Sequence, residues 1–171
     1  MILGQMPMMI GPGRRSLLRE RIRRLLGGLP PRVQVAALPW RALDQGDSEV
    51  MLVTSRGTGR WVLPKGWPEK REFLYEAAAR EAAEEAGVTG TIAPEAIGRF
   101  YYGKTLPSGL NWRCEVRVFP LHVEEIADKW PERKHRTRRW FSTQEAASLV
   151  DEADLAELIA GFSHNPRKSA A

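Results

Sequence analysis

The alternation of hydrophobic and polar residues divides the chain into one early helix followed by a series of strands. Residues 14–26 carry apolar side chains at every third or fourth position, the spacing of an amphipathic helix, and glycines and prolines follow them. From residue 32 the period changes to two, which predicts a β-hairpin over 33–54. A short strand over 61–63 ends at Pro64. The first third of the chain therefore reads as mostly β-structure behind a single helix.

The rest of the chain mixes helices and strands. Residues 73–86 contain six alanines and no β-branched residue, a composition that favours a helix, and Gly87 follows at a common C-cap position. Ser142 and Glu145 have the spacing of a capping box, which predicts a helix over 143–150. Further strands are expected at 88–92, 97–104, 112–123 and 136–141, with a last helix ending near residue 161. This order of elements predicts a mixed α/β domain.

Composition narrows the class of protein. A chain of 171 residues with 43% hydrophobic and 27% charged residues is long enough for one globular core, which excludes a disordered chain or a coiled-coil rod. No run approaches the ~20 apolar residues of a membrane span. Cys114 is the single cysteine, so an intramolecular disulfide and a cysteine-based zinc cluster are excluded. A cytoplasmic location is the expectation, because free thiols suit a reducing compartment.

The net charge of +5 has an uneven distribution. Residues 1–32 hold seven arginines and one glutamate, so the remainder of the chain is close to neutral and gives no reason to expect a nucleic-acid-binding domain. The arginine-rich helix could pack on the body or on a partner, bind anionic lipid or RNA, or act as an organelle transit peptide. We divide the chain into an N-terminal extension over 1–31, a main domain over 32–162 and a flexible tail over 163–171.

Acidic side chains concentrate on one face of the predicted helix at 73–86. Glu81 and Glu85 are four residues apart and share a face, and Glu84 lies about 60° to the side of Glu81. Like charges at this spacing repel one another, and a multivalent cation would relieve that repulsion. All-oxygen ligands suit hard ions such as Mg²⁺ or Mn²⁺. The helix is thus a candidate metal site, and Arg80 is placed to hold one of its acids.

A longer pattern surrounds these carboxylates. The segment from residue 66 to 88 matches G-x5-E-x7-R-E-U-x-E-E-x-G-U at each fixed position, which are Gly66, Glu72, Arg80, Glu81, Glu84, Glu85 and Gly87. This segment resembles the Nudix box, the signature of the Nudix hydrolases. The resemblance implies an α/β/α sandwich around a mixed β-sheet, covering about residues 32–160, with the N-terminal helix as an addition.

The resemblance also implies an activity and roles for residues. Nudix hydrolases cleave a nucleoside diphosphate linked to another moiety, or a related pyrophosphate, with Mg²⁺ or Mn²⁺. Glu81 and Glu85 would be the main metal ligands, together with the backbone carbonyl of Lys65. Glu84 would be a further ligand or the general base. Glu72 and Arg80 would form a supporting ion pair, which completes the expected catalytic set of Glu84, Glu81, Arg80 and Glu72.

Residues outside the box carry the expectation about substrate. Residues 54–56, 60–67 and 136–141 resemble the diphosphoinositol polyphosphate phosphohydrolases, a branch that also cleaves diadenosine polyphosphates. Clustered cations suit such a substrate because arginine matches pairs of phosphate oxygens. Residues 103–113 hold fewer cations than that branch does, and Trp112 could stack on a base instead. The expected substrate-binding residues are Arg32, Thr54, Ser55, Arg56, Arg60, Lys65, Arg113, Arg136 and Arg138.

Three interpretations of function remain open at this level. The first is a pyrophosphohydrolase for a diphosphoinositol polyphosphate or a (di)nucleoside polyphosphate. The second is a Nudix hydrolase for another nucleotide, such as a nucleoside triphosphate, a capped RNA 5′ end or a nucleotide sugar. The third is a non-catalytic Nudix domain that senses a ligand. The expected partner is a small phosphorylated substrate, with nucleic acid only as a possible RNA end, and the sequence does not predict the oligomeric state.

Overall fold

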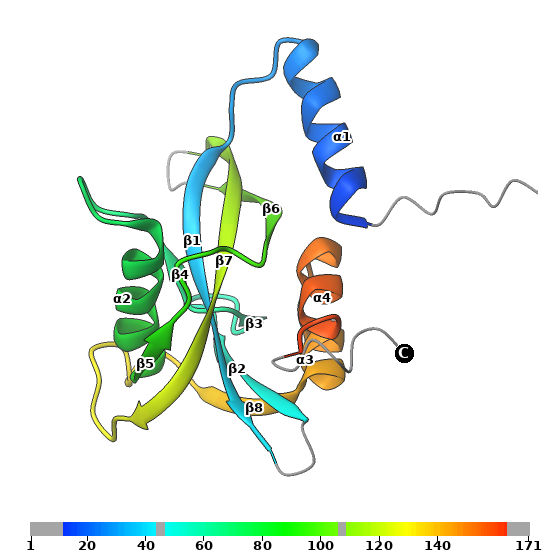
Figure 1. Cartoon of the computed structure of the whole chain (residues 1–171). Helices are drawn as coiled ribbons and strands as arrows, with labels where there is room; N and C mark the ends of the chain where they lie inside the picture. Colours follow the sequence, from blue (N-terminus) through cyan, green and yellow to red (C-terminus); the bar gives the residue numbers. More distant parts are fainter. Residues whose placement is uncertain (1–11, 44–46, 106–108, 164–171) are drawn as a thin grey trace, which may run out of the picture.

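A computed structural model describes residues 12–43, 47–105 and 109–163, with side chains from Leu18 onward (Figure 1). The helices are α1 (Pro12–Leu25), α2 (Leu74–Ala86), α3 (Thr143–Leu149) and α4 (Ala153–Ala160). The strands are β1 (Arg32–Ala42), β2 (Ser48–Thr54), β3 (Trp61–Val62), β4 (Lys65–Gly66), β5 (Val88–Ile92), β6 (Gly98–Thr105), β7 (Asn111–Ile126) and β8 (Arg138–Ser142).

The strands form one mixed sheet around a parallel pair at its centre. β1 and β7 run parallel, with Arg32 opposite Cys114 and Trp40 opposite His122. The path continues as β3-β2-β1-β7-β5, while β4 pairs with β1, β6 with β7 and β8 with β2, all in antiparallel orientation. Because β4 pairs with the central strand β1, the segment that precedes α2 lies against the middle of the sheet.

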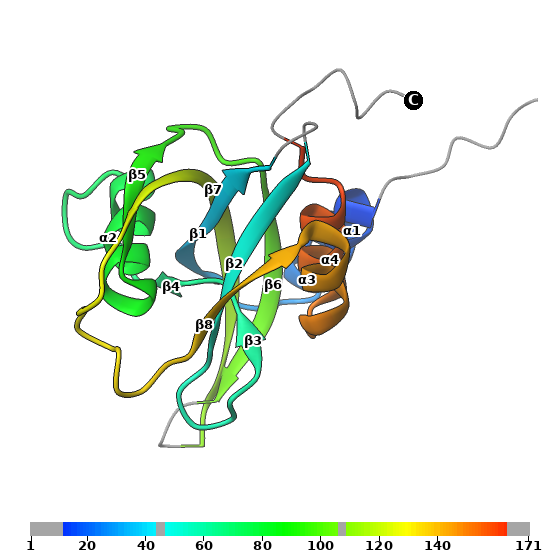
Figure 2. The same ribbon diagram turned by 90° about the horizontal axis from the view of Figure 1, so that it is seen from below.

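Helices cover both faces of this sheet, as Figures 1 and 2 show from two directions. Successive residues of a strand point to opposite faces, so Val35 and Ala37 of β1 pack with α2 whereas Ala36 and Leu38 pack on the side of α3 and α4. The buried alanines of α2 let its backbone approach the sheet closely, and they are Ala77, Ala78, Ala82 and Ala86. The predicted α/β/α sandwich is confirmed.

Most predicted elements are present, with shifted ends. The hairpin over 33–54 is formed by β1 and β2, although residues 44–46 at its turn lie outside the described residues. Ser142 is the N-cap of α3 as the predicted capping box requires, since its hydroxyl accepts a hydrogen bond from the Glu145 backbone N–H. β8 begins at Arg138, two residues later than expected. The two-residue strand β4 was not predicted, because two residues carry no readable period.

The N-terminal helix lies beside β6 and α4 (Figure 1). Its apolar stripe does not pack on the body: Leu18, Ile22 and Leu25 are exposed, and the polar Glu20 is the buried residue. The helix therefore contacts the body, as one of the expected alternatives had it, but not through the described residues of its apolar stripe. Along the described part of the chain, no helix is both long and apolar enough to cross a membrane. Residues 164–171, which make up most of the expected tail, lie outside the described residues.

Candidate active site on the carboxylate helix

Two glycines fix the position of α2 against its surroundings. Gly87 ends the helix in the left-handed conformation (φ 62°), and its N–H bonds back to Ala83. Gly66 of β4 lies against the Glu81 carboxylate, so a side chain at residue 66 would overlap that carboxylate. The close approach of β4 to α2 therefore depends on glycine, and it places Glu81 beside the sheet.

Glu72 and Arg80 form a bidentate ion pair at the start of α2. The two bonds join Arg80 Nε to Glu72 Oε1 (3.0 Å) and Arg80 Nη2 to Glu72 Oε2 (3.1 Å). Hydrogen bonding from Arg80 is the main cause that lowers the pKa of Glu72. Arg80 also donates to the Trp67 carbonyl (3.1 Å) and to Glu81 Oε1 (2.9 Å). One guanidinium thus ties the loop before the helix to the carboxylate face of the helix.

Glu85 is the most buried carboxylate of the cluster, with 7% of the residue exposed. The Lys65 backbone N–H donates to Glu85 Oε2 (3.1 Å), and Arg136 donates to Glu85 Oε1. Burial nevertheless dominates and raises the pKa of Glu85 to about 7, with Arg136 and Lys65 opposing it. Burial also raises the pKa of Glu81, against the effect of Arg80. Both groups would gain from a further positive charge nearby.

The carboxylates do not converge on one point in this structure. No group of three or more acidic, histidine or cysteine side chains within 12–43, 47–105 and 109–163 has the geometry of a metal site. Arg80 holds Glu81 and lies 3.6 Å from Glu84, and Arg136 holds Glu85. The donor set itself fits a hard divalent cation, because it consists of oxygens and includes the buried Glu85 and the half-buried Glu81, whose pKa values are both raised by burial. A bound cation would take over part of the role of the two arginines.

A polar pocket of about 540 Å³ opens beside this helix face. It is lined by Gln34, Ser55, Arg56, Lys65, Gly66, Trp67, Glu81, Glu84, Glu85, Tyr102, Lys104, Glu132 and Arg136. The pocket brings the three glutamates together with four of the expected substrate-binding residues, namely Ser55, Arg56, Lys65 and Arg136. Cations from β4, β6 and two loops therefore face the carboxylates across one cavity.

The remaining expected residues are engaged elsewhere. Arg60 pairs with Asp151 and Glu152 at the start of α4, both at 3.0 Å. Arg113 lies 3.8 Å from Glu20 of α1. Arg32 covers the ring of Trp112, 3.3 Å from its centroid, and Thr54 accepts a bond from the Thr137 backbone N–H through its hydroxyl. None of Arg32, Thr54, Arg60 and Arg113 lines the pocket.

Arg138 requires a correction, because its guanidinium points to the carboxyl end of α2. It donates to the carbonyls of Ala86, Gly87 and Ala127 and stacks on the ring of Trp130 at 3.9 Å. The carbonyls of Ala86 and Gly87 lie at the negative end of the dipole of α2, which an arginine stabilises. Arg138 therefore does not line the pocket beside the glutamates, and its expected contact with substrate stays a prediction that this structure does not support. The sequence did not predict that Arg138 caps α2, because an arginine that caps a helix and an arginine that binds phosphate have the same appearance in a basic run.

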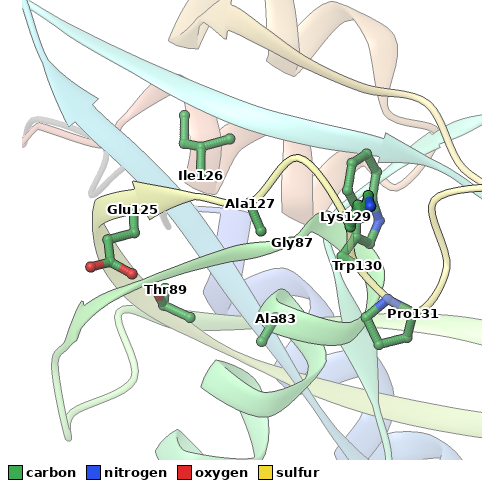
Figure 3. A pocket seen from close by; sticks show the side chains of 9 residues that line it. All are labelled: Ala83, Gly87, Thr89, Glu125, Ile126, Ala127, Lys129, Trp130 and Pro131. Carbon is green, nitrogen blue, oxygen red and sulfur yellow. The ribbon is translucent and has the colours of Figure 1, made fainter.

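A second pocket, of about 540 Å³, lies at that same end of the helix (Figure 3). Figure 3 shows Ala83 and Thr89 at its floor, with Lys129, Trp130 and Pro131 along one wall. The Trp130 indole N–H donates to the Glu85 carbonyl (3.2 Å). Trp130 therefore helps to hold the backbone of α2 at Glu85, the residue with the buried carboxylate.

Several residues of the first pocket were not predicted. Glu132, in the loop between β7 and β8, lies 3.4 Å from Arg56, bonds to Arg136 and donates its backbone N–H to the Glu84 carbonyl (3.2 Å). A single acid within a basic run gives little signal in sequence. Gln34 does give one, because it is a buried polar residue in an otherwise apolar strand, and the Tyr102 hydroxyl donates to its side-chain oxygen.

The fold and the arrangement of this site agree with a known family. Residues 30–162 match the family described as the NUDIX domain. The chain belongs to the Nudix family, whose members generally depend on a divalent metal. Glu72, Arg80 and the glutamates of α2 lie within the matched residues.

Individual relatives add detail. The chain is 34% identical over 131 residues to Nudix hydrolase 21, chloroplastic, of Arabidopsis thaliana, covering 75% of this chain and 64% of that protein. It is 30% identical over 119 residues to diphosphoinositol polyphosphate phosphohydrolase 2 of Rattus norvegicus, covering 68% and 62%. The chain thus spans less than two thirds of the length of either relative. The solved Ap4A hydrolase of C. elegans, in a binary complex, shares the fold at 22% identity, with a TM-score of 0.56 and coverage of 75% and 93%.

Proposed function

We propose that this chain is a Mg²⁺- or Mn²⁺-dependent pyrophosphohydrolase that cleaves a phosphoanhydride bond in a diphosphoinositol polyphosphate or a (di)nucleoside polyphosphate. The observation that carries the proposal is the pocket in which three α2 glutamates face Arg56, Lys65, Lys104 and Arg136. Carboxylates suit the cation and the clustered cations suit several phosphates. The names of the rat relative and of the C. elegans structure support this class of substrate.

The residues of the pocket divide the work. Glu81 and Glu85 would hold the divalent ion, and when bound that ion would supply positive charge to neutralise the reacting phosphates and a site to orient the attacking water. Glu84 has 46% of its side chain exposed and can accept the proton of a pocket water within hydrogen-bond reach. Arg56 and Lys65 would bind phosphate oxygens. The Glu72–Arg80 pair would keep the loop and the helix in register.

A specific observation favours a substrate that contains a base, whether a (di)nucleoside polyphosphate or another nucleotide, over a diphosphoinositol polyphosphate. The rings of Trp67 and Trp112 meet edge to face with centroids 6.2 Å apart, and Trp67 lines the pocket. Lys104 lies 5.3 Å from the Trp67 centroid. An indole beside a cation suits a base attached to phosphates, whereas an inositol ring has no π-face to stack. Turnover of base-containing against inositol-containing substrates therefore separates the nucleotide substrates of both interpretations from a diphosphoinositol polyphosphate.

A substrate panel with Mg²⁺ tests the proposal. It contains a diphosphoinositol polyphosphate, a diadenosine polyphosphate, a nucleoside triphosphate, a nucleotide sugar and a capped RNA, with products separated by ion-exchange chromatography. Turnover of either of the first two above the others supports the proposal. Turnover of another nucleotide alone supports the second interpretation, and tight binding of a panel compound without any turnover supports the sensor interpretation.

We also propose a cytoplasmic location, since the buried Cys114 is a free thiol. The Arabidopsis relative is named chloroplastic, so relatives of this family work in more than one compartment. Fractionation of cells that express the tagged chain would test this. Recovery of the protein within an organelle would contradict it and would assign the arginine-rich extension a targeting role.

A further inference from the structure

The helix α1 is attached to the body by its polar side. Glu20 is 6% exposed, and its carboxylate lies 2.7 Å from Arg23 of the same helix and 3.8 Å from Arg113 of β7. The helix contacts β6 and α4, and Figures 1 and 2 show it on the side of the sheet opposite α2. Among the side chains of α1 that the structure describes, from Leu18 onward, Glu20 is the one buried against the protein, and it faces the half-exposed Arg113.

The opposite side of α1 is apolar and exposed. Five large aliphatic residues remain open: Leu18 (56%), Ile22 (48%), Leu25 (86%), Leu26 (82%) and Leu29 (81%). At 100° per residue, the first four span an arc of about 100°, and Glu20 lies about 170° from its centre. The stripe is thus continuous and points away from the body.

Arginines border this stripe on both sides. Arg19 lies about 20° beyond Leu26 on the helical wheel, and Arg21 lies about 40° beyond Leu25. Both arginines are exposed. The outward face of the helix is therefore a band of leucine and isoleucine between two positively charged edges, which is the pattern of helices that lie in the plane of a membrane surface.

We propose that α1 binds the surface of an anionic lipid bilayer, with its apolar band in the acyl boundary and its arginines on the lipid phosphates. A bilayer satisfies both features of the face, since leucines leave water and arginines meet negative charge. A second copy of α1 would cover the leucines but would bring like-charged edges together. An RNA would pair with the arginines and leave the leucines in water. The lipid surface is the occupant that matches the whole face.

The position of α1 on the body determines which side of the protein would face the membrane. The polar side that carries Glu20 is bound to the body, so a helix lying on the membrane would hold the protein from the α4 side of the sheet. The carboxylate helix α2 lies on the other side (Figure 1). The chain would therefore sit on the bilayer with its catalytic helix turned away from it.

Flotation of the full chain with lipid vesicles tests the proposal. Vesicles of phosphatidylcholine with phosphatidylglycerol should carry the protein upward in the gradient, whereas pure phosphatidylcholine vesicles should not, and high salt should weaken the binding. The double variant Leu25→Glu/Leu26→Glu should lower the vesicle-bound to free ratio by about tenfold or more, because two exposed leucines are lost from the contact. Arg19→Glu/Arg21→Glu should lower it similarly.

Matched control variants distinguish binding by the outward face of α1 from non-specific adsorption to vesicles. Leu110→Glu replaces a leucine that is 62% exposed next to β7, and it should bind vesicles like the wild type. Lys129→Glu/Lys134→Glu changes the net charge as much as the arginine variant does, at two exposed positions outside α1. If this lysine variant lost binding to the same extent, the attraction would depend on net charge alone and the proposal would fail.

Other results would also overturn the proposal. One is the absence of wild-type binding to the anionic vesicles. A second is a dimer, seen by light scattering without vesicles, that Leu25→Glu/Leu26→Glu dissolves. A third is RNA binding that depends on Arg19 and Arg21 but tolerates loss of the leucines, in the absence of vesicle binding. Circular dichroism of each variant ensures that α1 remains helical.

Discussion

The two helices α1 and α2 turn different kinds of residue toward the same sheet. α2 buries a narrow alanine face and directs its carboxylates into a pocket, where arginines hold each of them. From Leu18 onward, where its side chains are described, α1 buries one glutamate and leaves Leu18, Ile22 and Leu25 exposed. Both show an apolar stripe in sequence, so the stripe alone does not reveal which side of a helix meets the protein. The side of a helix that faces the protein depends on how closely its backbone can approach the sheet. It also depends on which charged side chains of the protein lie opposite the helix.

That difference predicts a large effect from the carboxylates of α2. Glu85→Gln keeps the shape and removes the charge, so kcat/KM at saturating Mg²⁺ should fall by more than about a hundredfold. Glu84→Gln should remove turnover to a similar extent, about 10²-fold or more, with less loss of metal affinity, if Glu84 is the base. Activity should vanish with a chelator. Turnover assays and calorimetric titration with Mn²⁺ measure both quantities.

The matched control for these variants lies on the same helix. Glu76 is exposed in the first turn of α2 and does not line the pocket, so Glu76→Gln should leave turnover and metal affinity close to wild type. Wild-type turnover in Glu85→Gln would show that the ligand assignment is wrong. Equal loss of metal affinity in Glu84→Gln and Glu85→Gln would make Glu84 a ligand rather than the base.

The next largest effect concerns packing, where the two helices should differ again. Ala82 is fully buried between α2 and the sheet, so Ala82→Leu overfills that contact at a cost of about 1–3 kcal/mol and lowers the melting temperature by about 2–10 °C. Leu25→Ala on α1 changes an 86% exposed side chain and should shift stability by less than about 0.5 kcal/mol. Thermal unfolding of both variants checks this. A larger shift from Leu25→Ala would mean that α1 packs by its leucines.

The elements and the carboxylate positions of α2 could be predicted from the sequence. Local signals were reliable where the backbone itself imposes them: the alanines of α2, its C-cap Gly87 and the capping box at Ser142 each correspond to a formed element. The carboxylate positions followed from the box motif together with the helical period. Register within a helix is a local property, so one segment of sequence contains it.

The rest depends on contacts between distant segments, which one sequence does not contain. Glu132 and Glu85 are both bonded to Arg136 only because a loop folds across α2. Arg113 and Arg138 were expected in the pocket, but one lies near Glu20 and the other caps α2. Charge identifies which arginines can bind phosphate, whereas their distribution between substrate, helix ends and glutamates is decided by the fold.

The prediction that remote substrate phosphates bind to arginine is better tested at Arg56 than at Arg136. Arg136 already bonds to Glu85 and Glu132 and is 7% exposed, so its removal would disturb the carboxylates as well. Arg56 is 63% exposed at the pocket wall. Arg56→Ala should lower kcat/KM by about tenfold for a substrate with a long phosphate chain, the lower end for a charged hydrogen bond, and by less for a nucleoside diphosphate derivative. Equal ratios for short and long substrates at fixed salt would reject remote phosphate binding.

The smallest expected effect comes from removing the extension itself. We propose that residues 32–162 form the catalytic unit, so a chain that starts at Pro31 should fold and keep most of its turnover. The loss is limited because the ionic contact that the structure describes between α1 and the body is the pair of Glu20 with Arg113, at 3.8 Å, and no side chain of α1 from Leu18 onward lines the pocket. Partly exposed ion pairs of this kind contribute about 0–1 kcal/mol.

Two measurements on the same shortened chain make this prediction decisive. Its melting temperature should lie within a few degrees of the full chain, which corresponds to about 1 kcal/mol at this size, and its kcat/KM in solution should be unchanged within about twofold. Vesicle binding should disappear at the same time, since the whole apolar band is gone. A chain that unfolds or loses turnover would show that α1 belongs to the core of the domain, because a helix bound only by its polar side supplies too little contact to cause that loss.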